Sequence, residues 1–237
     1  MKRRLLPATD LARIAPRSVR DKRIALEAFE LGDPTFSYRP VASSVADIFD
    51  ASGSLLESAG RTGLVEIVRA IRRARMSEFG IEQNLKIAHA LVRFSTEFSV
   101  QARQVDLFPA TLGAASQLAY WSNLVLLIDG KLHVFYLDFR NTRRLDDEGR
   151  LFAYSVQNEF VRAAGLGLET AELSIFQFAT DGETRDASLF VHDGERALYS
   201  YSELVSMTDE TYRIWDEVCY ERAMAKRKFG GGGGGLL

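Results

Sequence analysis

The stretch SNLVLLIDGKLHVFYLDFRNT, residues 122–142, decides the fold prediction for this chain. The run LVLLI (124–128) is continuously apolar, which is typical of a central strand covered on both faces. Asp129 and Gly130 follow, and this dipeptide tolerates the positive φ angles of a two-residue hairpin turn. A second apolar run, LHVFYLDF (132–139), provides the returning strand. The sequence therefore predicts a hairpin at the centre of a sheet, with Asp138 and Arg140 at its end.

Helices and strands alternate around this hairpin. Helical spacing of apolar residues predicts helices at about 64–76, 81–103 and 150–164. The segment 171–180 predicts a strand, and HDGER (192–196) predicts a further hairpin. Two helices should follow, capped by Ser202 and Thr208. This order predicts an α+β fold, with a mixed central sheet flanked by helices and a helical N-terminal part.

Proline and glycine mark the expected domain boundaries. Four of the five prolines lie in residues 1–44, together with many basic residues, which predicts a basic N-terminal arm. Residues 45–229 are expected to form a single α+β domain. The glycine-rich end, 230–237, is expected to be a flexible tail.

Composition restricts the class of protein. The chain has 237 residues, 46% of them hydrophobic, which is enough for a sizeable core without a metal or disulfide. A single cysteine excludes an internal disulfide and a cysteine-rich zinc site, and it favours a reducing, cytoplasmic location. The apolar run 124–128 is far too short to span a bilayer, so no membrane partner is expected.

Charge is distributed unevenly although the formal net charge is only −2. Lysine and arginine gather in residues 1–23 and 69–75, whereas carboxylates gather further along the chain. Such asymmetry is compatible with an anionic partner on one face. The alternative is that these residues form solvated helix faces.

The hairpin, the helix containing FAYSVQNEF (152–160) and the strand AELSIFQF (171–178) together resemble the core of the PD-(D/E)XK nuclease superfamily over about residues 81–180. The resemblance implies a restriction-endonuclease-like core in a bacterial or phage-type protein. It also implies DNA or RNA as the partner and Mg²⁺ as the cofactor, with no other cofactor expected. In such a site, carboxylates at adjacent strand ends hold a divalent ion that activates water.

That family places Asp in the first hairpin strand, an acid-x-Lys triplet at the end of the second, and often Gln or Tyr on the next helix. Carried onto this chain, the pattern predicts Asp138, Arg140 and Gln157 as catalytic residues and Asp138 and Asn123 as metal ligands. Asn123 stands where the family has Asp, and Arg140 stands where it has Lys. Because the charge of Arg is fixed and Asn is a weak Mg²⁺ ligand, cleavage is expected to be impaired or absent.

Further residues are candidates for contacts with phosphate. Tyr154 and Asn158 share one helix face and, with Arg150, could hydrogen-bond phosphate, or could form a solvated helix side. Glu97 is a candidate for an additional carboxylate. The predicted nucleic-acid-binding residues are Arg69, Arg72, Arg73, Arg75, Arg143 and Arg144.

Two functions compete at this point. The first is a divergent nuclease-like domain that binds nucleic acid. The second is a non-catalytic structural or adaptor subunit of a larger assembly, in which the basic arm or the C-terminal helix docks onto a protein partner. An enzyme of another class stays open as a third alternative.

Overall fold

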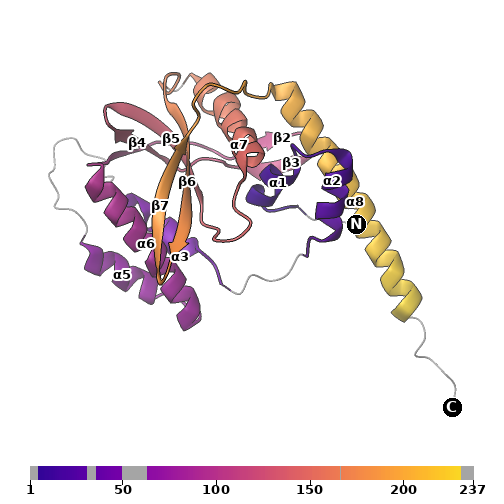
Figure 1. The fold of residues 1–237 in the computed structure, drawn as a ribbon, viewed down its shortest axis with the longest axis horizontal. Helices are drawn as coiled ribbons and strands as arrows, with labels where there is room; N and C mark the ends of the chain where they lie inside the picture. Colours follow the sequence, from indigo (N-terminus) through magenta and orange to yellow (C-terminus); the bar gives the residue numbers. More distant parts are fainter. Residues whose placement is uncertain (1–4, 31–35, 50–62, 166, 231–237) are drawn as a thin grey trace, which may run out of the picture.

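The computed structural model describes residues 5–30, 36–49, 63–165 and 167–230, which form an α+β fold, as predicted (Figure 1). The predicted glycine-rich tail beyond residue 230 lies outside these residues. The elements are α1 (Ala8–Ile14), α2 (Val19–Glu27), α3 (Arg39–Ser43), α4 (Val45–Ile48), α5 (Leu64–Arg72), α6 (Glu78–Glu97), β1 (Gln101–Gln104), β2 (Ala110–Leu112), β3 (Ala115–Leu118), β4 (Leu124–Ile128), β5 (Lys131–Asp138), α7 (Asp147–Phe160), η1 (Arg162–Ala164), β6 (Glu172–Asp181), β7 (Thr184–Val191) and α8 (Tyr201–Gly230).

Five of the strands form one mixed sheet in the order β1-β4-β5-β6-β7. Strands β5 and β6 are parallel, and the other neighbours in this sheet are antiparallel. Since a parallel pair needs a crossover connection, α7 lies between β5 and β6 in the chain. Strands β2 and β3 form a separate ribbon. The predicted mixed sheet flanked by helices is confirmed at this level.

The predicted central hairpin is confirmed in detail. Ile128 of β4 pairs with Lys131 of β5, which leaves a two-residue turn. Asp129 and Gly130 have φ angles of 50° and 75°, as a type I′ turn requires. A Cβ at Gly130 would meet nothing within 4 Å, so glycine is favoured here by backbone conformation and not by crowding.

Successive side chains of the sheet enter two different cores. Val125 and Val134 pack on one side with α1, α2, α7 and α8, whereas Leu126 and Phe135 pack on the other side with α3 to α6. Figure 1 shows the sheet between these two groups of helices. Both faces are covered, which explains why LVLLI is apolar without alternation.

Basic residues of α2 are paired with acidic residues of α8. Lys22, only 2% exposed, forms an ion pair with Glu210. Arg23 reaches Glu217 at 3.1 Å and Glu221 at 2.6 Å. Part of the uneven charge seen in the sequence is therefore balanced within the chain.

Both N-terminal helices also contribute to a core. Leu11 and Ala12 of α1 and Leu26 of α2 are fully buried in the same cluster as Trp215 of α8. The boundary predicted at residue 44 stays a prediction, although α1 and α2 pack directly on α7 and α8 (Figure 1).

Two predictions about the C-terminal third are wrong. HDGER does not close a hairpin: β7 pairs with β6 through the turn around Gly182, and Gly194 lies in the loop that leads to α8. The two helices predicted from Ser202 and Thr208 are one helix, in which Thr208 is completely buried. Within the described residues, no helix combines the length and apolar character needed to cross a bilayer.

Candidate functional site

Asp138 ends β5 as a buried carboxylate with 1% exposure. Its Oδ2 accepts hydrogen bonds from Leu145 N at 2.8 Å and Gln177 Nε2 at 3.2 Å, and its Oδ1 accepts one from Arg140 N at 3.4 Å. Burial raises the pKa of this carboxyl, while the three donors act in the opposite direction. Asp138 therefore ties the loop after β5 to the neighbouring strand β6.

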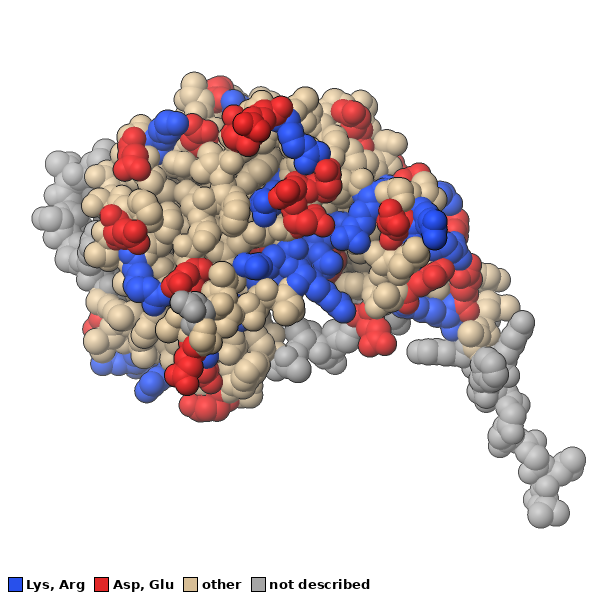
Figure 2. Space-filling view, viewed as in Figure 1, with Lys and Arg blue, Asp and Glu red and all other residues tan. Residues whose placement is uncertain are grey.

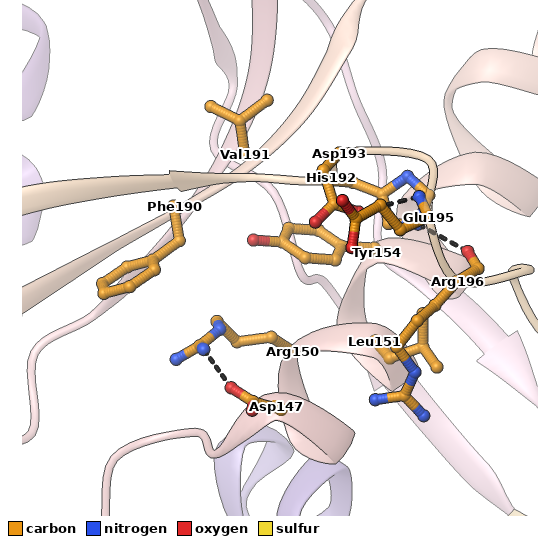
Figure 3. A pocket seen from close by; sticks show the side chains of 10 residues that line it. All are labelled: Asp147, Arg150, Leu151, Tyr154, Phe190, Val191, His192, Asp193, Glu195 and Arg196. Carbon is orange, nitrogen blue, oxygen red and sulfur yellow. Dashed lines mark hydrogen bonds and ion pairs between the residues drawn. The ribbon is translucent and has the colours of Figure 1, made fainter.

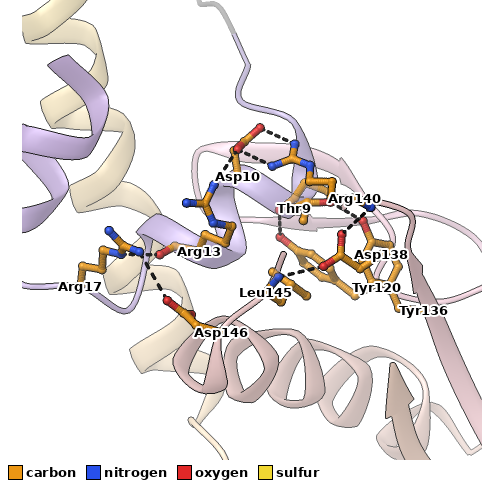
Figure 4. A network of polar contacts seen from close by, with 11 residues as sticks. Thr9, Asp10, Arg13, Arg17, Tyr120, Tyr136, Asp138, Arg140, Leu145 and Asp146 are labelled. Atoms are coloured by element: carbon orange, nitrogen blue, oxygen red, sulfur yellow. Dashed lines mark hydrogen bonds and ion pairs between the residues drawn. The ribbon is translucent and has the colours of Figure 1, made fainter. Parts of the chain in front are cut away.

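Arg140 directs its guanidinium away from the end of β5 and towards α1 (Figure 4). Nη1 and Nη2 each donate to one carboxylate oxygen of Asp10 at 2.6 Å, although the two residues are 130 positions apart. Burial lowers the pKa of Arg140, but the hydrogen bonds and charge of Asp10 outweigh it, so the pKa is raised. Bidentate pairing of this kind is the strong form of an Arg–carboxylate contact.

The same network continues through α1 (Figure 4). Thr9 Oγ1 and the Tyr136 hydroxyl are 2.7 Å apart. Arg17 donates to Asp146 at 3.4 Å, which links the end of α1 to the start of α7. The contacts around Arg140 therefore join α1 to the sheet and to α7.

Gln157 and Asn123 do not contact Asp138 through any hydrogen bond of the described residues. Gln157 is fully buried, and its Nε2 donates to Tyr120 O at 2.6 Å and Ser174 O at 3.1 Å. Asn123 is exposed at the start of β4. The predicted catalytic roles of Asp138, Arg140 and Gln157, and the predicted metal-ligand roles of Asp138 and Asn123, stay predictions.

Carboxylates do not gather around Asp138. Across residues 5–30, 36–49, 63–165 and 167–230, no group of three or more His, Cys, Asp or Glu side chains is placed to hold a metal ion. Glu97 lines a groove of about 650 Å³ together with Asp129 of the hairpin turn, which is the opposite end of β5 from Asp138.

Arg150 and Tyr154 line a cavity of about 300 Å³ beside β7 (Figure 3). Arg150 lies over the ring of Phe190 at 4.3 Å and donates to Gln177 Oε1 at 3.2 Å. Tyr154 is 5% exposed, and burial raises its pKa. Because carboxylates such as Asp147 and Asp193 also line this cavity, its charge does not favour an anion.

The six arginines predicted to contact nucleic acid are all exposed, but they belong to two separate regions. Figure 1 shows α5 on the outer side of α6, whereas the loop between β5 and α7 lies nearer the middle of the molecule. Arg69 and Arg72 are in α5, and Arg73 and Arg75 follow it, while Arg143 and Arg144 are in the loop. They do not form one continuous stripe along a single element.

The sequence prediction missed the segment Gln104–Phe108, called here the anchor segment. It begins with the last residue of edge strand β1, and beyond Gln104 it has no regular structure. Val105 N donates to Asn123 O at 3.0 Å. Phe108 is 80% exposed, whereas Leu107 is only 6% exposed. Gln104 and Asp106 are exposed as well, so alternate residues face outwards, as in an extended chain.

One signal in the sequence could have identified this segment. Leu107 and Phe108 are an apolar pair between Asp106 and Pro109, and they belong to no helical or alternating run. An aromatic residue without a place in a periodic pattern is a candidate for a partner contact.

We expect Asp138→Ala to lower the free energy of unfolding by about 2–3 kcal/mol, because Leu145 N and Gln177 Nε2 lose a buried acceptor. Asp138→Asn keeps one acceptor and should cost less. Denaturation with urea measures both variants. A loss below about 0.5 kcal/mol for Asp138→Ala, typical of an exposed surface site, would contradict the role in anchoring the loop.

The same variants test how stability depends on pH. Burial raises the pKa of Asp138 in the folded chain above the unfolded value of about 3.9. The protonated carboxyl therefore favours the folded state. This contribution to stability is complete at pH values below the unfolded pKa and is lost as pH rises through the folded pKa. Asp138→Asn should therefore gain stability relative to the parent as pH rises from about 4 to about 7.

The Asp138→Asn variant also tests the predicted Mg²⁺ ligand. If Asp138 binds Mg²⁺, magnesium chloride should raise the Tm of the parent and not of Asp138→Asn.

Comparison with known proteins reveals one clear relationship. A family model described as the sliding clamp-binding bacterial toxin SocB matches residues 9–225. The DNA replication inhibitor toxin SocB of Caulobacter vibrioides (strain NA1000 / CB15N) is 35% identical over 234 residues, which cover 98% of each chain. No solved structure matches the chain.

These matches overturn the predicted relationship to the PD-(D/E)XK nucleases and the predicted nucleic-acid-binding function. The resemblance rested on a hairpin, a helix and a strand, and many mixed sheets with one crossover contain this succession. Asn123 and Arg140, at the positions that would have been specific, already departed from the nuclease pattern.

Proposed function

This chain belongs to the SocB family of sliding clamp-binding bacterial toxins, and we propose that it binds a bacterial sliding clamp and thereby inhibits DNA replication. The match to a replication inhibitor over 98% of both chains supports this proposal. The protein partner that the sequence left open is then the clamp. Action on the replication machinery is in keeping with the cytoplasmic location expected from the single cysteine.

The observation that carries the proposal is the exposure of Phe108 on the anchor segment. With 80% of its surface in water, it is the most exposed of the large hydrophobic residues described. Single exposed apolar residues are common. Phe108, however, lies on an extended segment with polar neighbours at alternate positions, and binding interfaces commonly centre on one aromatic side chain that fills a pocket.

The anchor segment is held in place before any partner arrives. Leu107 is inserted in the core shared by α1, α7 and α8, and Val105 N is bonded to Asn123 O. A segment fixed in its extended form loses little conformational freedom on binding, which favours affinity.

Strand β1 leaves a second binding element beside Phe108. Among the described strands, β1 pairs only with β4. Its outer edge therefore presents backbone groups that an extended segment of a partner could use. Backbone pairing along β1 and insertion of Phe108 together form one continuous interface for the clamp.

The test is binding of the full chain to a purified bacterial sliding clamp, measured by calorimetry. We expect Phe108→Ala to cost about 2 kcal/mol or more, which is about a thirtyfold loss of affinity. The same variant should no longer inhibit clamp-dependent DNA synthesis in vitro. Phe108 is exposed, so the variant should keep the parent's Tm.

Tyr220→Ala is the matched control. Tyr220 is an aromatic residue of α8 that is 65% exposed, and the C-terminal helix is one of the two docking elements predicted from the sequence, beside the basic arm. Its replacement should leave clamp affinity unchanged. Loss of binding in Tyr220→Ala with full binding in Phe108→Ala would move the interface from the anchor segment to α8.

A further inference from the structure

A pocket of about 820 Å³ lies between α1, α6, the loop after β5 and the β6–β7 hairpin, apart from the anchor segment. Its volume falls in the range of small-molecule sites, about 300–1,000 Å³. Lys86, Arg140, Arg143 and Arg185 line it, and Asp10 is the single carboxylate among its lining residues. Figure 2 shows Lys and Arg side chains gathered near the middle of the face in view.

Arg185 is the decisive residue of this pocket. It is only 4% exposed, and burial of a charge is costly unless the charge is paired. Its guanidinium donates to Phe139 O at 3.1 Å and Gln83 Oε1 at 2.8 Å, and lies 5.7 Å from the ring of Tyr38. Among the described residues these contacts are all with neutral groups. A guanidinium has five N–H donors, so some stay available to an anion.

Arg143 adds a second cation and an unusual backbone. Its side chain is exposed, and its φ angle is 56°, in the left-handed region that residues other than glycine rarely adopt. Such conformations concentrate at ligand sites, where the surrounding structure maintains them. Lys86 forms a surface pair with Glu82 at 2.7 Å, which is a weak contact.

Aromatic side chains also line the pocket. Phe36 lies edge-to-face with Tyr38 at 4.9 Å and with Phe79 at 5.4 Å. Phe79, Gln83 and Lys86 of α6 are spaced by four and three residues, so they share one helix face. Phe79 is 55% exposed, which leaves its ring accessible to a planar ligand.

Phe36 and Phe79 are called here the aromatic wall. Cationic side chains and this aromatic wall in one pocket together indicate the chemistry of the ligand. The guanidinium group of arginine forms bidentate hydrogen bonds with phosphate oxygens, and nucleobases stack on exposed aromatic rings. We propose that this pocket binds a nucleoside phosphate, with its phosphate near Arg143 and Arg185 and its base against the Phe36–Phe79 wall. The ligand is a single nucleotide and not a nucleic acid chain, and the proposal does not depend on clamp binding.

Calorimetry of the full chain with ATP, GTP, adenosine, inorganic pyrophosphate and a short oligonucleotide, at about 0.15 M salt, tests the proposal. We expect at least one nucleotide to bind about tenfold more tightly than either adenosine or pyrophosphate. No binding of either nucleotide would overturn the proposal. Equal binding of pyrophosphate would overturn the role of the aromatic wall, and preferential binding of an oligonucleotide would overturn the assignment to a single nucleotide.

Arg143→Gln and Arg144→Gln form a matched pair, because both side chains are exposed neighbours and only Arg143 lines the pocket. Arg143→Gln should weaken nucleotide binding about tenfold, and Arg144→Gln should leave it unchanged. Phe79→Ala should weaken binding of the nucleotide but not of pyrophosphate. Phe98 caps the C-terminal end of the same helix, α6, and Phe98→Ala should change the binding of neither ligand. Equal effects within either pair would overturn the assignment to this pocket.

Discussion

Replacing Asp10 by alanine is expected to lower the free energy of unfolding by about 3 kcal/mol, because the guanidinium of Arg140 loses both of the carboxylate oxygens to which it donates. Asp10 is 4% exposed, and its oxygens lie 2.6 Å from Nη1 and Nη2 of Arg140. Removing one member of a buried pair costs about 3–5 kcal/mol. The lower end of this range applies to Asp10→Ala, since the side chain of Arg140 is 29% exposed and water can solvate part of its charge.

A double-mutant cycle isolates this contact. Asp10→Ala combined with Arg140→Met should cost at least about 1 kcal/mol less than the sum of the single variants, because no unpaired charge is left. Lys131→Ala, which breaks an exposed 3.1 Å pair with Glu172, is the control and should cost about 0.5 kcal/mol or less. Additive losses at Asp10 and Arg140 would show that the two side chains do not stabilise the fold as a pair.

Replacing Trp215 by alanine is expected to cost about 3–5 kcal/mol, the largest effect of any substitution proposed. Trp215 is 1% exposed in the core shared by α1, α2, α7 and α8. Its ring lies edge-to-face with Phe29 at 5.7 Å, and the guanidinium of Arg222 lies 5.6 Å from it. The variant loses a large apolar surface and leaves a cavity between α2 and α8.

Urea denaturation of Trp215→Ala and Tyr220→Ala compares a buried and an exposed aromatic residue on one helix. Tyr220→Ala should stay within about 0.5 kcal/mol of the parent. We expect Trp215→Ala also to expose α2 to proteolysis, since Trp215 and the Lys22–Glu210 pair join α2 to α8. A similar small loss in both variants would mean that α8 does not depend on this contact.

Local chemistry explains which strands could be predicted. Asp129 and Gly130 follow an apolar run and precede another, so the β4–β5 hairpin is encoded within fifteen residues. The chain has two further Asp-Gly pairs, at 181–182 and 193–194, and the prediction chose the second of these. Gly182 and Gly194 both have positive φ angles, so the local signal is the same at each. The pairing of β7 with β6 decides between them, and pairing is a non-local property.

Non-local contacts also decide the meaning of the charged residues. Arg140 stands two positions after Asp138, which suggested a shared site, yet its partner is Asp10 from α1. Nothing in the sequence around Arg185 indicates that its side chain is buried. Such features depend on which segments meet, and residues more than a hundred positions apart meet only in the folded chain.

The central hairpin, the approximate positions of α5 to α7 and the mixed α+β class could be predicted from the sequence, because each depends on neighbours within a few turns of chain. The single cysteine also excludes an internal disulfide. Only the tertiary structure decided that Asp138 anchors a loop, that Arg140 belongs to α1, and that Phe108 is left in water while Leu107 is buried. The physical reason is that hydrophobic periodicity specifies local structure, whereas exposure and ion pairing follow from the packing of distant segments.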